Sequence, residues 1–137
     1  MKKKLGIGGM VSGLVAVLFF LAGSAVCMAG VTDIPQAELM QRIKSNNAGL
    51  ILDVRSKEEY AEGHIPGAIN IPHDQIGSRL AEIVSYKNKD VVLYCRSGKR
   101  VGIAANTLQV AGFSKLLHLV GDMGAWLSNG NLPIIKK

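Results

Sequence analysis

From residue 30 onward, the apolar residues of the chain gather in four short runs, and each run predicts a β-strand. The runs cover residues 50–54, 68–71, 91–94 and 116–120. They are apolar almost without interruption, which is typical of strands that are buried on both faces of a parallel sheet. We therefore expect these runs to form the centre of the fold.

The segments between and around the runs show the spacing of amphipathic helices. Helices are predicted over residues 36–45, 75–86, 99–111 and 122–128. The second carries an apolar stripe at i, i+4, i+7 and i+8, formed by Ile76, Leu80, Ile83 and Val84. Asp74 precedes this helix as a suitable N-cap, and Gly112 is suited to end the next one.

The alternation of strands and helices predicts an α/β fold. We expect one domain with a central, mainly parallel sheet of about five short strands, flanked by helices on both faces. In such sheets, ligands bind outside the carboxyl ends of the strands. The residues that follow the predicted strands are therefore the candidates for a functional site.

Residues 1–29 have a composition of their own. Lysines at positions 2–4 precede a long uncharged apolar stretch, which ends in small residues. This three-part order is typical of a secretory signal peptide, with cleavage expected after Ala29 or Ala25. We expect export to the periplasm and a folded domain over residues 30–137. An uncleaved membrane anchor is the alternative, because the apolar stretch is long enough to span a bilayer.

The composition excludes several classes of protein. The 137 residues carry a formal charge of +6, but three of the 16 basic residues lie at positions 2–4. Residues 30–137 therefore hold 13 basic against 10 acidic side chains, or +3, without a basic run interleaved with aromatic residues. No nucleic-acid partner is expected. Two cysteines, Cys27 and Cys95, are too few for a disulfide-dense scaffold or a zinc cage of several cysteines, and no cofactor is expected.

The candidate chemistry lies in the run from Cys95 to Arg100. Cys95 ends the predicted strand 91–94, and the predicted helix 99–111 begins shortly after it. Backbone N–H groups at a helix N-terminus, together with the helix dipole, favour an anion at this point. Gly98 allows the loop a conformation that a Cβ atom would forbid.

Three basic residues of this loop, Arg96, Lys99 and Arg100, add positive charge beside the thiol, and Ser97 completes the loop. Such a setting favours the thiolate as the resting form. A lone cysteine at a strand end is often only a small buried apolar residue. The combination within seven residues favours a reactive cysteine instead. Once residues 1–29 are removed, Cys95 has no second thiol, which excludes a dithiol cycle of the C-x-x-C kind.

Motifs spread along the chain resemble those of the rhodanese-like domain family, over about residues 31–135. The matching segments are residues 52–55 (LDVR), 59–72 (EYAEGHIPGAINIP) and 95–100 (CRSGKR). Residues 121–126 (GDMGAW) resemble the closing G-G-x-x-A-W motif, except that Asp122 stands where a second glycine is usual. Within the family, the chain is similar to the small exported single-domain thiosulfate sulfurtransferases of bacteria.

The resemblance implies covalent sulfur transfer through Cys95. The thiolate would take the outer sulfur of thiosulfate, release sulfite and pass the sulfur from a persulfide to cyanide or a thiol. The loop residues would bind the donor anion: Arg96, Ser97, Gly98, Lys99 and Arg100. It also implies a monomer that needs no metal.

Two other functions remain open. A phosphatase or arsenate reductase on the same fold would use a loop one residue longer than the four residues between Cys95 and Arg100. Loop length therefore favours sulfur transfer. The other alternative is a persulfide carrier or partner-binding module with weak turnover, and an intact loop is compatible with it.

Outside the loop, the sequence suggests mainly structural roles. Asp53 and Arg55, at a strand end near the expected pocket, are predicted to be supporting charges that pair with each other or with nearby glutamates. His64 is predicted to be a hydrogen-bonding turn residue rather than a base, and Trp126 to belong to the core. His118 has no partner that the sequence identifies.

Overall fold

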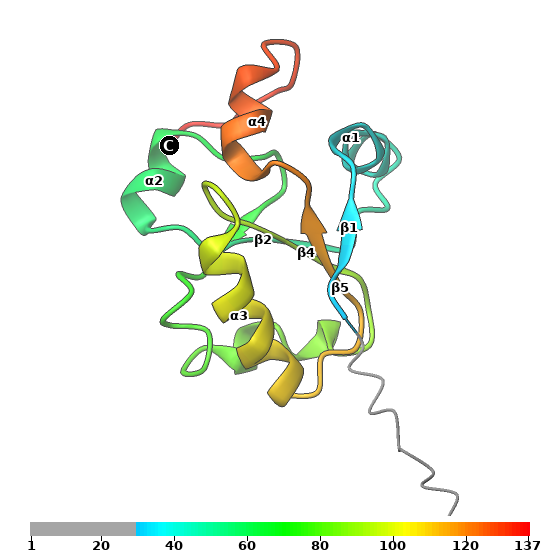
Figure 1. Cartoon of the computed structure of the whole chain (residues 1–137), viewed down its shortest axis with the longest axis vertical. Coiled ribbons are helices and arrows are strands. Elements are labelled where there is room, and N and C mark those ends of the chain that lie inside the picture. Colours follow the sequence, from blue (N-terminus) through cyan, green and yellow to red (C-terminus); the bar gives the residue numbers. More distant parts are fainter. Residues whose placement is uncertain (1–29) are drawn as a thin grey trace, which may run out of the picture.

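The apolar runs form a parallel sheet in the computed structural model, which describes residues 30–137 (Figure 1). Within this part of the chain the sheet has five strands in the order β1-β5-β4-β2-β3. The strands are β1 (Thr32–Ile34), β2 (Leu50–Asp53), β3 (Ile69–Asn70), β4 (Val91–Tyr94) and β5 (Leu116–Leu119). The α-helices are α1 (Gln36–Lys44), α2 (Lys57–Glu62), α3 (Lys99–Val110) and α4 (Asp122–Ser128). The predicted α/β architecture is confirmed.

The central strand β4 is buried along its whole length because helices cover both faces of the sheet. Val91 and Leu93 belong to the same core cluster as the buried residues of α3. Val92 and Tyr94 point to the opposite face, where they share a cluster with buried residues of α1 and α4. Figure 1 shows α3 on the other side of the strands from α1 and α4.

The carboxyl ends of three neighbouring strands meet at one edge of the sheet. In the parallel register, Asp53 at the end of β2 lies opposite Tyr94 of β4, and Leu93 lies opposite His118 of β5. Cys95 is the first residue after β4, so it lies between the ends of β2 and β5. This register brings residues far apart in the sequence to the same place.

Helix α2, which the sequence analysis did not identify, is fixed at its start by two sets of contacts. Ser56 and Glu59 form a capping box, in which each side chain accepts a hydrogen bond from the backbone N–H of the other residue. The Glu59 carboxylate also accepts hydrogen bonds of 2.6 and 2.9 Å from Arg100 in the first turn of α3. These bonds from Arg100 lower the pKa of Glu59 from 4.5 to about 2.

The predicted helix over residues 75–86 is wrong. This segment forms turns and two short 3-10 helices, η1 (Leu80–Glu82) and η2 (Val84–Tyr86), whose backbone bonds join residues three apart. Asp74 therefore caps no α-helix. Gly77 and Ser78 both disfavour a regular helix here, while Ile76 and Ile83 are still fully buried in the core. The apolar stripe reflected burial rather than helical geometry.

Strand β1 was also missed, because only Ile34 of its three residues is buried. The predicted signal peptide, residues 1–29, lies outside the described residues. Within residues 30–137, none of the helices has the length and apolar character needed to cross a membrane.

The core contact between α3 and the sheet gives a direct stability test. Leu108 on α3 is fully buried, so Leu108→Ala is expected to lower the free energy of unfolding by about 2–5 kcal/mol by leaving a cavity. Val110 on the same helix is 84% exposed, and Val110→Ala should change it by less than about 0.5 kcal/mol. Urea unfolding measures both. Equal effects of the two substitutions would contradict the described packing.

The Glu59–Arg100 pair predicts a pH-dependent contribution to stability. The pKa of Glu59 is lower in the folded state, so the contribution is complete well above pH 4.5 and is lost as the pH falls through about 2. Glu59→Gln should therefore cost on the order of 1–2 kcal/mol at pH 7, and about half as much at pH 3. Glu58→Gln on the same helix is the control, since Glu58 forms no described ion pair. A cost of Glu59→Gln that is the same at both pH values in urea unfolding would refute this account.

Candidate active site

Cys95 is held from its backbone at the carboxyl end of β4. Only 1% of its surface is exposed, and it is the free cysteine among the described residues. Its N–H donates to Oδ1 of Asp122 at 2.9 Å, and its carbonyl accepts from the N–H of Met123 at 2.9 Å. The next carbonyl, that of Arg96, accepts from the N–H of Gly124 at 3.1 Å. The start of α4 therefore fixes the nucleophile candidate from one side.

The residues from Cys95 to Arg100, here called the Cys95 loop, turn back over the sulfur. The N–H of Gly98 donates to Sγ of Cys95 at 2.9 Å. Gly98 has φ of +101°, in the left-handed region that favours glycine, and it is the N-cap of α3. Among the described residues, no acceptor is found for the other backbone N–H groups from Arg96 to Val101. Unpaired N–H groups at the start of a twelve-residue helix can stabilise an anion, so the geometry is compatible with the predicted anion site, which stays a prediction.

The three basic residues that the sequence places beside the thiol differ in whether an acidic side chain binds them. Arg96 and Lys99 are exposed, and neither forms an ion pair with a described acid. Arg100 is bound by Glu59 in a two-pronged ion pair, and the bond to Glu59 raises the pKa of Arg100. Its charge is therefore largely balanced. Two cations of the loop remain available for a dianion.

Asp53 and Arg55 form a buried ion pair beside the loop. Nε and Nη2 of Arg55 reach the Asp53 carboxylate at distances of 2.6 to 3.1 Å, and Nη2 also donates to the carbonyl of Gly63 at 2.7 Å. The sequence allowed these residues to pair with each other or with nearby glutamates. In the structure they pair with each other. The guanidinium of Arg55 donates only to the Asp53 carboxylate and the Gly63 carbonyl. The ion pair therefore joins β2 to the end of α2.

A cavity of about 360 Å³ lies next to the Cys95 loop. It is lined by Arg55 shortly after β2, Glu59 and Glu62 of α2, Arg96 of the loop, and Met123, Gly124 and Leu127 of α4. Arg96, the residue after Cys95, is the loop residue that lines the cavity, while Cys95 itself is buried and is not part of the lining. A volume of this size is ample for a small sulfur-containing anion.

Asp122 is the site residue whose role the sequence did not reveal. Its backbone has φ of +52°, so it keeps the left-handed turn that a glycine would adopt at this position. The residue is 2% exposed and its carboxylate binds both Cys95 and Nε2 of His118, the latter at 2.9 Å. The departure from the family motif was visible in the sequence. The contacts were not, because Asp122 lies 27 residues after Cys95.

The other residues singled out from the sequence are structural. The Nδ1 of His64 lies 2.8 Å from the carbonyl of Tyr60, and its ring stacks on the Tyr60 ring at a centroid distance of 3.7 Å. Trp126 is fully buried and donates from Nε1 to the carbonyl of Pro133. The predicted hydrogen bonding of His64 and the predicted burial of Trp126 are confirmed. Over residues 30–137, the structure brings together no group of three or more potential His, Cys, Asp or Glu metal ligands.

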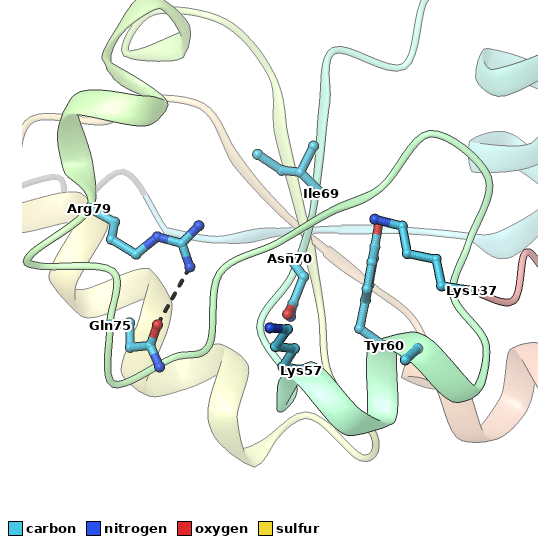
Figure 2. A pocket seen from close by; sticks show the side chains of 8 residues that line it. Lys57, Tyr60, Ile69, Asn70, Gln75, Arg79 and Lys137 are labelled. Carbon is cyan, nitrogen blue, oxygen red and sulfur yellow. Dashed lines mark hydrogen bonds between the residues drawn. The ribbon is translucent and has the colours of Figure 1, made fainter.

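A larger cavity, of about 540 Å³, lies along the other side of α2 and edge strand β3 (Figure 2). Its lining is basic and partly apolar: Lys57, Tyr60, Ala61, Ile69, Asn70, Gln75, Arg79 and Lys137. Lys137 lies over the Tyr60 ring, with Nζ 5.4 Å from the centroid. No residue of the Cys95 loop lines this cavity. The larger of the two cavities is therefore not the one next to the candidate nucleophile.

Comparisons with known proteins give a consistent family. The model of the rhodanese-like domain matches residues 35–129. A sulfurtransferase of Allochromatium vinosum is 39% identical over 105 residues, which cover 77% of this chain and 95% of that protein. A Bacillus subtilis protein named "Putative sulfur carrier protein YrkF" is 33% identical over 111 residues, but only 59% of its length is covered.

A solved structure supports the same relationship. The human single-domain sulfurtransferase TSTD1 superimposes with a TM-score of 0.63 at 28% identity, over 73% of this chain and 98% of the human protein. The family match covers most of the chain, and the five-stranded parallel sheet agrees with this structure. This chain belongs to the rhodanese-like domain family.

Proposed function

We propose that the protein is a thiosulfate sulfurtransferase that carries sulfur as a persulfide on Cys95. The observation that carries the proposal is the Cys95 loop itself. It holds one thiol against the N–H of Gly98, with further unpaired N–H groups and two unpaired cations around it. Sulfurtransferases among the relatives support the same reaction class.

The first half-reaction forms the persulfide. The Cys95 thiolate attacks the outer sulfur of thiosulfate, a new S–S bond forms, and the S–S bond of thiosulfate breaks. Sulfite leaves with the electron pair of that bond, so the two negative charges of the donor leave on sulfite and the charge of the thiolate passes to the terminal sulfur. No proton transfer is needed, because the attacking sulfur is already an anion.

The loop stabilises the charges that this reaction moves. Arg96 and Lys99 attract the dianionic donor from solvent, since neither is neutralised by a described acid. The N–H groups of the first turn of α3 face the terminal sulfur and stabilise its charge without reorganising. In the second half-reaction, cyanide or a thiolate attacks that terminal sulfur and the Cys95 thiolate is regenerated.

Phosphoryl or arsenate chemistry is less well supported. A phosphatase of this kind would bind the oxyanion with its loop arginine, whereas two of the N–H groups of Arg100 are already bound by Glu59 at 2.6 and 2.9 Å. The loop is also one residue shorter than such a reaction requires. Both features favour a single sulfur atom over a tetrahedral group.

A persulfide carrier is the second candidate function. It would use the same loop and the same first half-reaction, but would pass the sulfur to a partner protein with little turnover on small acceptors. The relative named as a sulfur carrier favours it. For either function we propose that residues 1–29 direct export to the periplasm and that the folded domain acts as a monomer.

Intact mass after incubation with thiosulfate tests the proposal. We expect a gain of about 32 Da, the mass of one sulfur atom, in the wild-type protein and none in Cys95→Ala, because the persulfide needs the Cys95 sulfur. Cyanide should then remove the added mass as thiocyanate. Val110→Ala, at an exposed position of α3 outside the Cys95 loop, is the control and should still gain the sulfur.

The outcomes separate the candidate functions. Repeated turnover with cyanide or a small thiol supports the enzyme, and a single sulfur gain without turnover supports the carrier. Absence of a mass gain, or sulfite release that persists in Cys95→Ala, would overturn the proposal. Hydrolysis of an aryl phosphate that depends on Cys95 would favour a phosphatase instead.

A further inference from the structure

Asp122, which is buried, and His118, which is partly exposed, form a pair against the Cys95 loop. One oxygen of Asp122, Oδ1, accepts the N–H of Cys95, and the other, Oδ2, lies 2.9 Å from Nε2 of His118. A Cβ atom on Gly98 would lie 3.2 Å from Oδ2 of Asp122 and 3.5 Å from the His118 ring. The pair therefore lies in contact with the residue whose N–H binds the sulfur.

His118 connects this buried carboxylate with solvent. The Asp122 side chain is 3% exposed and the His118 side chain 27%. On the far side of the ring, Nδ1 lies 3.5 Å from Asp33 of β1, whose side chain is 72% exposed. A proton can thus enter or leave His118 without opening the core.

The Asp122 carboxylate and the sulfur anion repel each other, and a protonated His118 can compensate the charge of the carboxylate. Asp122 places a carboxylate against the backbone of Cys95 and close to Gly98, whose N–H binds the sulfur. The sulfur must be an anion to react, and like charges at close range disfavour each other. The groups in contact with Asp122 are His118 from β5, with Asp33 from β1 behind it, and the backbone of Cys95 after β4. The Cys95 sulfur also interacts with Arg100 of α3, which is bound by Glu59 of α2. Of these, His118 is the side chain in direct contact with the Asp122 carboxylate, and an imidazole can gain or lose a proton.

We propose that Asp122 and His118 are positioning residues that tune the Cys95 sulfur anion through the protonation state of His118. Protonated His118 balances the Asp122 carboxylate, and the sulfur anion is then favoured. Neutral His118 leaves the carboxylate uncompensated, and the anion is disfavoured. This inference deepens the proposed function and rests on its anionic sulfur.

A purely conformational role for Asp122 makes a different prediction. The backbone of Asp122 lies in the left-handed region, so Asp122→Gly keeps the turn while removing the carboxylate. Asp122→Asn keeps an oxygen acceptor for the Cys95 N–H while removing the charge. His118→Gln keeps a donor toward Asp122 but cannot become a cation. These variants separate charge from shape.

The experiment measures the rate of Cys95 alkylation by iodoacetamide between pH 4 and 10 on the full-length protein. Tryptic peptide 90–96, which contains Cys95, is quantified by mass spectrometry so that Cys27 does not contribute. Asp122→Asn and Asp122→Gly are expected to move the midpoint of the pH–rate profile down by about one unit, and His118→Gln to move it up by a similar amount. At a pH below the midpoint, one unit corresponds to about a tenfold change in rate.

Asp33→Asn is the control for general surface charge, because Asp33 is exposed and reaches only the far side of His118. Its shift should be less than about a third of the Asp122→Asn shift. Unchanged midpoints, shifts of the Asp122 and His118 variants in the same direction, or an equal shift from Asp33→Asn would overturn the inference. So would a wild-type Cys95 that is not alkylated at any pH.

The test is independent of the sulfur donor. If thiosulfate loads Cys95 but the midpoints do not move, the inference fails while the proposed function stands. If the midpoints move as described but no sulfur is loaded, the proposed function fails and the tuning of the sulfur anion stands.

Discussion

The site depends on the hydrogen bond from the N–H of Gly98 to Sγ of Cys95. This bond requires the chain to turn back within three residues, and the left-handed conformation of Gly98 makes that turn possible. The same turn starts α3 and points the first N–H groups of the helix toward the space above the sulfur. Because β4 is buried on both faces, Cys95 itself cannot move away from this arrangement. The burial of β4 thus holds the following loop in the conformation that binds the sulfur.

The fold could be predicted where local sequence determines it. The continuous apolar run of β4 predicted that strand, and Gly112 predicted the end of α3, both to within one residue of the observed bounds. Prediction failed where tertiary packing determines the structure. Ile76 and Ile83 recur at helical spacing because both reach the core, yet the backbone between them forms turns and 3-10 helices. Strand β1 adds so few apolar residues that only its pairing with β5 identifies it.

The residues of the Cys95 loop could be predicted from the sequence, but the charged side chains that contact the loop from other elements could not. Cys95 and Gly98 follow one another closely, so their meeting could be inferred from spacing. The binding of Arg100 by Glu59 spans 41 residues, and the bond from Cys95 to Asp122 spans 27. Sequence periodicity carries no information on such contacts, which follow from the parallel register and the short connections after the strands. The structure therefore reduces the free cations of the loop and adds a carboxylate beside it.

The most direct test of the account is the backbone amide response to sulfur loading, measured by nuclear magnetic resonance on ¹⁵N-labelled protein. If the N–H groups of the Cys95 loop bind the transferred sulfur, the amide signals of residues 96–101 should change most on addition of thiosulfate, with Gly98 among the largest changes. Cys95→Ala should abolish these changes. Largest changes around Lys57, Arg79 and Lys137, or the same changes in Cys95→Ala, would contradict the account.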